Sequence, residues 1–397
     1  MSKAKDISEI ITDANFGGTL DVTGAITGAS ATLTGDITAS SLNGGQLGGR
    51  RNLVINGAMQ IAQRGTSATN AGGGYNTLDR WRFTQNTSGL GNFTAEQSTD
   101  IPSGEGFKSS LKMTNGSAKS ISTDMTCYIE TKFEGQDVQQ LKYGTSSAEN
   151  VTLSFFVRSS VTGTFCCHLF QAGNNKAHVK EYTISSANTF EKKTLTFTGD
   201  TATSLANDNT SELSISWVLG SGTGAHISAD SWTSVPSAKG FCTSNQTNWI
   251  TTNGATFYIT GVQLEVGSVA TPFEHRSFGE TLALCQRYYE QWDIINGENI
   301  VLGTSYSGGN PTGVVEFHII KRAAPTVTLP SAGASGNTIS FLATNGAYAS
   351  TVGSHSADRI TTRGNRISGT GYSGITAASP TMLYGTGTPA FKFDSEL

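Results

Sequence analysis

The stretch GVQLEVGSVATPFEHRSFGETLALCQRYYEQW, residues 261–292, decides the fold because a strand pattern gives way to a helix pattern inside it. Its first six residues alternate between apolar and polar side chains, which predicts a half-buried β-strand. Ser277 is a good helix N-cap, and Glu280 three residues later completes a capping box. The sequence therefore predicts that a β-domain ends near residue 275 and that a connecting helix spans residues 276–292.

Apolar side chains recur at helical spacing through this predicted helix, at Phe278, Leu282, Cys285, Tyr289 and Trp292. Two interpretations of the stripe are open. It packs against its own domain, or it faces identical chains in an assembly. In the second case the candidates for a trimer interface are Phe278, Leu282, Cys285 and Tyr289.

The composition favours many short strands joined by tight turns, since only 14% of the 397 residues are charged and 47 are glycine. Strand-like runs with turn signals between them recur through residues 51–275, which predicts a jelly-roll β-sandwich. One pair of runs, residues 53–55 and 59–62, is expected to form a hairpin around Asn56-Gly57. Residues 293–397 predict a smaller C-terminal β-sandwich, so the expected fold class is mainly β with one connecting helix.

The N-terminal residues contain a short repeat. Residues 21–31 (DVTGAITGASA) align with residues 32–42 (TLTGDITASSL), which places Val22 against Leu33 and Ile26 against Ile37. A repeat this thin cannot bury its own apolar face, so these four residues predict a shaft of intertwined identical chains over residues 18–50. The alternative is a flexible linker rich in glycine, serine and threonine. Residues 1–17 are expected to be a polar attachment leader.

Common signatures of catalysis and metal binding are missing from the sequence. It contains no H-E-x-x-H, no G-x-S-x-G and no glycine-rich phosphate loop, and its six histidines are far apart, so neither a metal nor a cofactor is expected. A glycan-cleaving enzyme needs two carboxylates at a fixed separation. Asp79 and Asp230 are the best candidates, and each also fits an ordinary turn or strand end.

Charge and hydropathy exclude two further classes of partner. A net charge of −4 without a basic block argues against sequence-independent nucleic-acid binding. No run of eighteen apolar residues is present, so no membrane span is expected. The five cysteines include no C-x-x-C pair and are expected to be buried, reduced thiols.

Candidate binding residues gather in the C-terminal region. Loops on a β-scaffold often carry the tyrosine, arginine and histidine side chains that contact a ligand, although an ordinary solvated loop has the same composition. The candidates for receptor contact are Tyr348, His355, Arg359, Arg363, Arg366, Tyr372 and Tyr384.

Four stretches together resemble a family of bacteriophage tail-fibre proteins whose central jelly roll is similar to a carbohydrate-binding module. They are NLVINGAMQIAQRGTS (52–67), YNTLDRWRF (75–83), VTLSFFVRSS (151–160) and the stretch 261–292. KRAAPTVTL (321–329) resembles the family's downstream domain. The resemblance covers roughly residues 51–329 and includes no catalytic residues.

The resemblance implies a homotrimeric fibre of the virion, made in the host cytoplasm. Its N-terminal leader would attach to tail adaptor, nozzle or baseplate proteins, and its C-terminal part would reach host-surface polysaccharide or lipopolysaccharide. The expected function is non-catalytic receptor binding, strengthened by several sites per particle. The alternatives are a tailspike enzyme that degrades polysaccharide and a purely structural tail or baseplate component.

Overall fold

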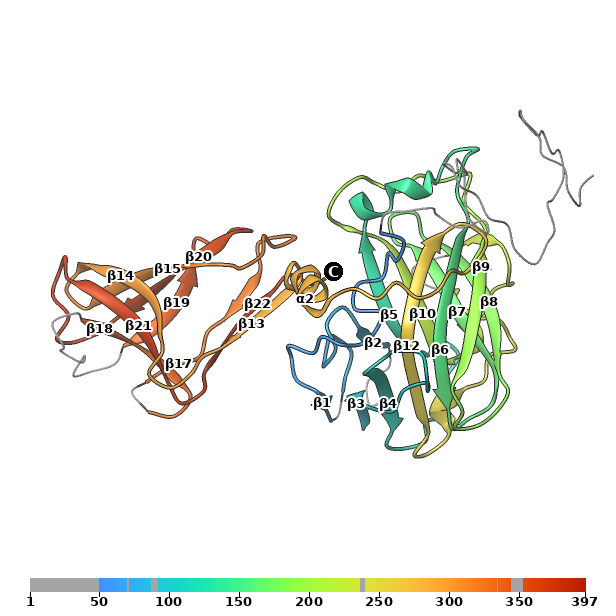
Figure 1. The fold of residues 1–397 in the computed structure, drawn as a ribbon, viewed down its shortest axis with the longest axis horizontal. Coiled ribbons are helices and arrows are strands. Elements are labelled where there is room, and N and C mark those ends of the chain that lie inside the picture. The colour runs from blue at the N-terminus through green and yellow to red at the C-terminus, as the bar shows by residue number, and fades with distance from the viewer. Residues whose placement is uncertain (1–49, 70, 87–91, 236–239, 334, 344–352) are drawn as a thin grey trace, which may run out of the picture. The chain divides into compact units, whose positions relative to one another are not determined.

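The computed structural model describes residues 50–69, 71–86, 92–235, 240–333, 335–343 and 353–397. Within these ranges the chain is mainly β, and a β-sandwich is followed by one α-helix and a second β-domain (Figure 1). The described part contains no helix that is long and apolar enough to span a membrane. The predicted leader and the repeat units lie outside these ranges, and so do Val22, Ile26, Leu33, Ile37 and Tyr348.

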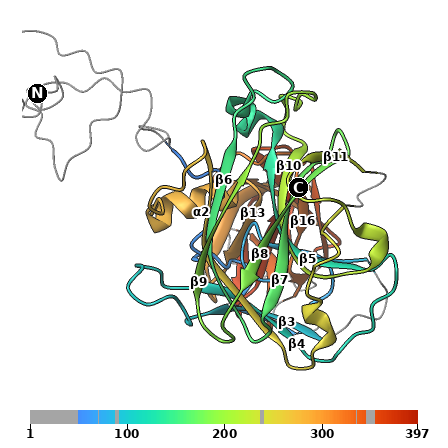
Figure 2. The same cartoon turned by 90° about the vertical axis from the view of Figure 1, so that its right-hand side faces the viewer.

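Two antiparallel six-stranded sheets lie face to face and form the jelly-roll sandwich (Figures 1 and 2). The first sheet contains, in spatial order, β1 (Ser67–Ala68), β3 (Phe93–Ser98), β4 (Ser110–Asn115), β12 (Thr256–Val266), β6 (Val151–Ser159) and β9 (Glu191–Phe197). The second contains β11 (Trp232–Ser234), β8 (Lys176–Ile184), β7 (Gly163–Gln171), β10 (Ser211–Ser221), β5 (Thr126–Glu134) and β2 (Arg82–Gln85). In the described part of the sandwich, four 3-10 turns connect the strands: Gly135–Asp137, Gln139–Leu141, Thr223–Ala225 and Trp249–Thr251.

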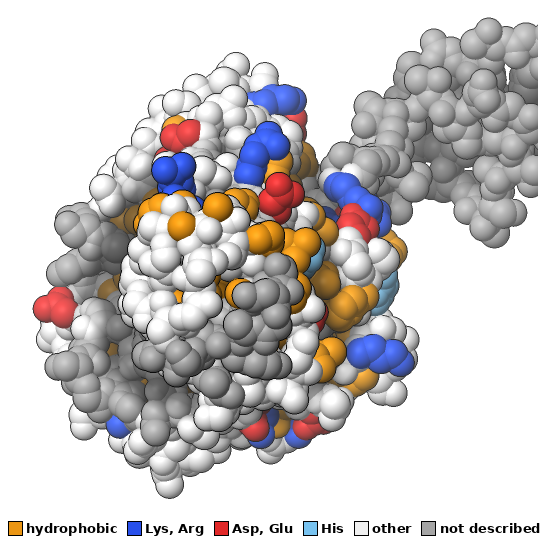
Figure 3. Space-filling view, turned by 90° about the vertical axis from the view of Figure 1, so that its left-hand side faces the viewer, with side chains coloured by type: hydrophobic (Ala, Val, Ile, Leu, Met, Phe, Trp, Pro, Cys, Tyr) orange, Lys and Arg blue, Asp and Glu red, His pale blue; other side chains and the backbone are white. Residues whose placement is uncertain are grey.

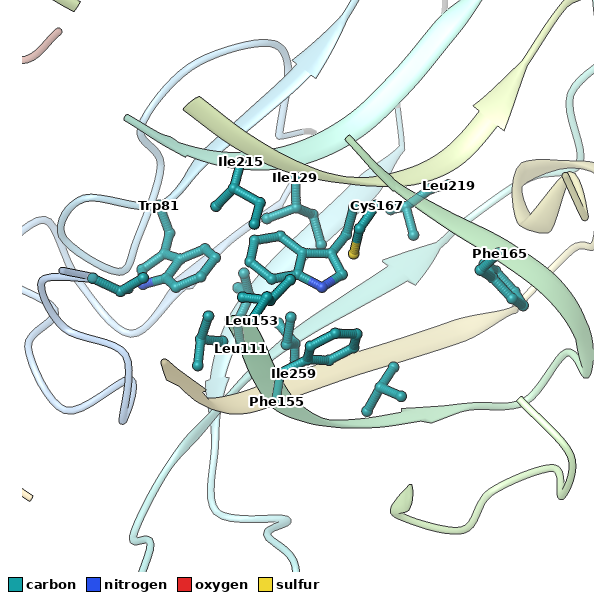
Figure 4. Packing of buried hydrophobic residues seen from close by; sticks show 14 of the residues in the cluster. Trp81, Leu111, Ile129, Leu153, Phe155, Phe165, Cys167, Ile215, Leu219 and Ile259 are labelled. Atoms are coloured by element: carbon teal, nitrogen blue, oxygen red, sulfur yellow. The ribbon is translucent and has the colours of Figure 1, made fainter. Parts of the chain in front are cut away.

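Large apolar side chains from both sheets fill the space between them. Figure 4 shows Trp81, Phe155 and Ile215 converging there. The ring of the fully buried Trp217 lies 5.5 Å from that of Trp81 and 5.6 Å from that of Phe155. Each such side chain contributes about 1.5–3 kcal/mol when it leaves water. Strand β6 lies between β12 and β9 in its sheet and contributes Leu153, Phe155 and Val157 to this core.

The hairpin expected around Asn56-Gly57 does not form. Asn56 has a positive φ of 59°, and no strand is present between residues 51 and 62. Its side-chain amide instead donates to the carbonyls of Ile61 and Asp79, both at 2.9 Å, while its Oδ1 accepts from the N–H groups of Gln60 and Ile61. These four hydrogen bonds favour a folded loop over strand pairing, so the hairpin prediction was wrong.

The connecting helix is shorter than residues 276–292. Helix α2 (Phe278–Gln286) begins at the predicted N-cap, where the Ser277 hydroxyl accepts from the N–H of Glu280 at 3.3 Å. After Gln286 the chain turns and continues as strand β13 (Tyr289–Asp293), which pairs with β22 (Ala390–Asp394). A partner strand about a hundred residues away overrides the local helical spacing, so Tyr289 and Trp292 belong to a strand and not to a helical stripe.

The second β-domain contains two sheets within the described ranges. One is three-stranded, with the order β13, β22 and β16 (Thr326–Thr328). The other is seven-stranded and contains, in order, β17 (Ser331–Ala332), β18 (Thr338–Ala343), β21 (Pro380–Thr386), β14 (Asn299–Ser307), β15 (Asn310–Glu316), β20 (Gly364–Thr370) and β19 (Ser354–Asp358). All pairs are antiparallel except β17 with β18. A separate core, which includes Phe341, Phe391 and Phe393, confirms the smaller C-terminal β-domain.

A buried ionic cluster connects the ends of this domain to the sandwich. The guanidinium of Arg80, of which 1% is exposed, pairs with Glu396, donates to the carbonyl of Lys132 at 2.7 Å and lies 3.5 Å above the ring of Tyr288. Close by, Arg287 forms two hydrogen bonds of 2.7 Å with the buried carboxylate of Glu134. The segments that contribute Arg80 and Tyr288 are therefore held together by charge as well as by apolar packing.

Candidate functional site

An open cleft of about 480 Å³ lies on the second β-domain. We call it the arginine cleft because three arginines, Arg359, Arg363 and Arg366, line it. Its volume falls within the usual range for small-ligand pockets, roughly 300–1,000 Å³. The other lining residues are Val314, Val315, Glu316, Phe317, His318, Ile320, Thr361, Gly364 and Asn365.

The strand register explains why these side chains meet. Arg366 in β20 lies opposite Val314 in β15 and opposite Asp358 in β19, so the three side chains share one face of the sheet. Apolar side chains are unusually exposed on this face, with Val314 at 64% and Ile320 at 49%. Figure 3 shows one face of the molecule on which hydrophobic side chains gather beside basic and acidic ones. The cleft therefore combines an apolar wall with positive charge.

The three arginines differ in their partners. Arg366 forms a bidentate ion pair with Asp358, with N–O distances of 2.6 and 2.7 Å, and these hydrogen bonds hold the pKa of Asp358 below its ordinary value. Arg359 and Arg363 have no ion pair and no side-chain hydrogen bond to any residue that the structure describes. Two guanidinium groups of the cleft are therefore free to bind a ligand.

The wall of the cleft around His318 is fixed by a buried carboxylate. Glu290 is fully buried, pairs with both His318 and Lys321, and accepts from the indole N–H of Trp292 at 2.6 Å. The His318 ring also lies 4.9 Å from the Trp292 ring. Burial lowers the pKa of Lys321 although Glu290 opposes this effect. These contacts hold the exposed His318 in place, while the side chains of Glu290 and Lys321 stay buried.

Among the described residues, the other receptor-contact candidates, His355, Tyr372 and Tyr384, do not line the cleft. His355 and Tyr372 hydrogen-bond to each other and pack against Phe341 in the domain core. Tyr384 is half-buried in β21. Strand alternation accounts for the difference, because His355 points to the opposite side of β19 from its exposed neighbours Ser354 and Ser356. The structure thus brings together three of the predicted residues and places His355 and Tyr372 in structural positions.

The candidates for the trimer interface on the connecting segment also differ from one another. Phe278 is 59% exposed and Leu282 is half-buried. Cys285 and Tyr289 are buried by the chain itself, Tyr289 beneath the guanidinium of Arg64 at 3.6 Å. Of the four, Phe278 is the residue most available to another chain, and assembly through this segment stays a prediction.

A second, smaller cavity of about 170 Å³ lies on the outer face of the sandwich, and we call it the sandwich pocket. Register places Arg82, Glu130, Ser216 and His168 in one row across β2, β5, β10 and β7. Phe241 covers this row, with its ring 4.8 Å from that of Tyr128 and 4.9 Å from that of His168. No local sequence pattern indicates this pocket, because the residues of its central row come from four separate strands.

The polar groups of the sandwich pocket are mostly covered. Both ring nitrogens of His168 and the Ser216 hydroxyl are buried without a hydrogen-bond partner among the described residues, and burial lowers the pKa of His168 to about 3. Glu130 accepts from Arg82 at 2.7 Å and from Thr84 at 2.8 Å. The pocket is smaller than a typical ligand site and its polar atoms are mostly covered, so the arginine cleft is the stronger candidate.

Neither cavity contains the acid pair that glycan hydrolysis requires. Glu316 is the one carboxylate in the lining of the arginine cleft, and Glu130 is the one in the sandwich pocket. Asp79 is buried and accepts from Gln63, while Asp230 pairs with Lys180 at 2.5 Å. Within the described residues, no group of three histidine, cysteine or acidic side chains is arranged to hold a metal ion.

Comparisons with known proteins give limited similarity. No protein-family model and no curated protein matches the sequence. Among solved structures, the enzymatically active domain of tailspike protein 4 of bacteriophage CBA120 is 13% identical with a TM-score of 0.30, covering 54% of this chain and 21% of that one.

Two carbohydrate-binding domains are similar at the same level. The family 11 carbohydrate-binding module of Clostridium thermocellum, in complex with a β-1,3-1,4-mixed-linked tetrasaccharide, is 11% identical with a TM-score of 0.25, covering 52% of this chain and 97% of that one. The N-terminal cellulose-binding domain of Cellulomonas fimi β-1,4-glucanase C is 13% identical with a TM-score of 0.26, covering 53% and 100%. Similarity this low assigns neither a ligand nor an activity to the chain.

Proposed function

We propose that this chain is a non-catalytic attachment protein of the bacteriophage tail-fibre type that binds host-surface glycans. The observation that carries the proposal is the arginine cleft, where Arg359 and Arg363 lie unpaired beside the exposed apolar side chains of Val314 and Ile320. A sugar ring has an apolar C–H face and polar edges. A cleft with an apolar wall and several strong hydrogen-bond donors fits both surfaces.

Assignment to the tail-fibre type rests on sequence motifs. The stretches 52–67, 75–83, 151–160 and 261–292 resemble that family. The proposal includes a homotrimer attached to the virion by its N-terminal residues. Three weak sites on one fibre, and several fibres on one particle, would then give strong attachment through effective concentration.

A glycan array tests the binding proposal. The full chain would be applied to purified capsular polysaccharides and lipopolysaccharides, alongside the double variant Arg359→Gln/Arg363→Gln and the control Lys392→Gln. Lys392 is an exposed cation on β22 of the same domain and lies outside the cleft. We expect binding that the control retains and the double variant loses. Equal binding by the double variant would move the site away from the cleft.

Two further measurements separate the alternatives. New reducing ends released from a bound polysaccharide would favour a tailspike enzyme, which the single carboxylate in each cavity argues against. No binding to any surface polysaccharide would favour a structural tail component. Light scattering at micromolar concentration tests assembly, since a clean monomer of 41.6 kDa would exclude the trimer.

A further inference from the structure

We propose that the arginine cleft takes anionic glycans, namely saccharides that carry a carboxylate or a phosphate group. This inference rests on the proposed function, because it specifies the chemical class of glycan that the same cleft binds. Three features of the cleft support it: unpaired positive charge, a fixed backbone beneath that charge, and one acidic side chain at its edge.

The first feature is the charge of the lining. Three arginines and one glutamate line the cleft, and Asp358 forms an ion pair with Arg366 while it interacts with Arg359 only through a smaller coulombic effect. Arg359 and Arg363 therefore present guanidinium groups whose charge no described side chain neutralises through an ion pair. A neutral sugar would hydrogen-bond to these groups but would leave their charge uncompensated. A carboxylate or phosphate provides two acceptor oxygens that match the guanidinium fork.

The second feature is that the loop carrying both free arginines is tied down. Thr361 closes the turn between them: its N–H donates to the carbonyl of Gly364 at 2.9 Å, and its hydroxyl accepts from the N–H of Arg363 at 3.1 Å. From the other wall, the N–H of Phe317 donates to the carbonyl of Arg363 at 2.9 Å. Only the arginine side chains must become ordered when a ligand binds, which lowers the entropic cost of binding.

The third feature is the position of Glu316. It lies opposite Gly364 in the pairing of β15 with β20, is exposed, and lines the same cleft as Arg363. Its carboxylate can accept hydrogen bonds from sugar hydroxyls, but it repels a second negative group close to the first. The cleft should therefore favour a glycan with spaced charges, such as one acidic group per repeat unit, over a densely charged polyanion.

Calorimetry with matched probes tests the ligand class. For the carboxylate arm, tetragalacturonate is compared with its fully methyl-esterified form, which removes the charge and keeps the sugar chain. For the phosphate arm, mannose 6-phosphate is compared with mannose. The proteins are the full chain, Arg359→Gln, Arg363→Gln, the double variant, Glu316→Gln and the control Lys392→Gln. Because the side chains of Arg359 and Arg363 are exposed and form no hydrogen bond or ion pair with described residues, their replacement should not disturb folding, which circular dichroism checks.

We expect the acidic probe of at least one arm to bind. The affinity of its neutral form should be lower by a factor of about ten or more. Each Arg→Gln change should weaken the acidic probe by roughly tenfold, since it removes one charge-assisted contact. Glu316→Gln should tighten its binding by a few-fold, Lys392→Gln should change little, and added salt should weaken it.

The outcomes separate this inference from the proposed function. Equal binding of the acidic and neutral probes, or full binding of an acidic probe by the double variant, would overturn the anionic class. So would the absence of binding to both acidic probes. Suppose that the full chain binds a neutral polysaccharide on the array and the double variant does not. Glycan binding through the cleft would then be supported, while the proposal that the ligand is anionic would be wrong. Weaker binding by Glu316→Gln would contradict the repulsion argument.

Discussion

The buried ion pair between Arg80 and Glu396 allows a direct test of how much buried charge contributes to the stability of this chain. Their side chains are 1% and 5% exposed, so the replacement Glu396→Gln leaves a guanidinium charge buried without its anion. Removing one partner of a buried ion pair typically costs about 3–5 kcal/mol. Arg80 would retain its hydrogen bond to the carbonyl of Lys132 and its position over Tyr288. We therefore expect a loss near the lower end, about 3 kcal/mol of unfolding free energy.

The double replacement Arg80→Leu/Glu396→Leu removes both charges and keeps apolar volume in the same space. Buried ion pairs that are exchanged for apolar residues of similar size often lose little stability, because the desolvation cost of the charges disappears as well. The double variant should therefore be more stable than Glu396→Gln, although it carries one more substitution.

Urea unfolding followed by tryptophan fluorescence provides the measurement. Trp81 follows Arg80 directly and lies in the sandwich core, so the summed emission of the five tryptophans includes a signal from the region of the pair. A control substitution, Glu149→Gln, breaks the more exposed pair with Lys142 and should cost less than about 1 kcal/mol. The reasoning would be refuted by a Glu396→Gln cost as small as that of the control, or by a double variant less stable than Glu396→Gln.

Three further predictions concern titration and reactivity. Burial raises the pKa of Asp79 from 3.8 to about 6, so its contribution to stability is present below pH 3.8 and is lost as the pH rises through 6. Relative to Asp79→Asn, the wild type should lose up to about 3 kcal/mol of unfolding free energy over that pH range, measured by urea unfolding. Parallel plots of unfolding free energy against pH for the two proteins would contradict this. Burial lowers the pKa of His168 from 6.5 to about 3, so its contribution is present above pH 6.5 and is lost as the pH falls towards 3; His168→Gln should flatten the acid side of the stability profile, and an unchanged profile would count against it. All five cysteines are free and buried, so a thiol reagent such as Ellman's should react with none of them in the native protein and with all five in denaturant.

The sequence predicts the β-domains well because their signals are local. The run in β6 and the alternation in β12 identify buried strands without reference to any partner. The end of helix α2 could not be predicted in this way. Residues 289–293 continue a helical spacing, and only pairing with β22, about a hundred residues later, makes them a strand. The loop at Asn56 shows a related limit, since one side chain forms four hydrogen bonds that a turn motif does not reveal.

The sequence likewise indicates some residues of the candidate site and leaves out others. A cluster of arginines within eight residues signals a polar loop, and the structure brings Arg359, Arg363 and Arg366 into one cleft. It does not signal that His355 faces the core, because that depends on which side of β19 is covered. It also leaves out Val314 and Ile320, the apolar wall, since their exposure becomes apparent only when β15 and its following loop are placed beside β20.

The residues of the sequence motifs and the residues of the arginine cleft differ in how strongly the fold constrains their identity. Several motif residues that resemble the tail-fibre family, including Asp79, Arg80, Arg287 and Tyr288, belong to the buried ionic cluster or contact it. Their side chains are buried or half-buried and their charges are balanced by one another, so we expect few substitutions to be tolerated there. In the arginine cleft, Arg359, Arg363 and Glu316 are exposed and form no ion pair with described residues, so exchanging them should cost little stability. A change of ligand would then need changes only at positions such as Arg359, Arg363 and Glu316, while the ionic cluster stays as it is.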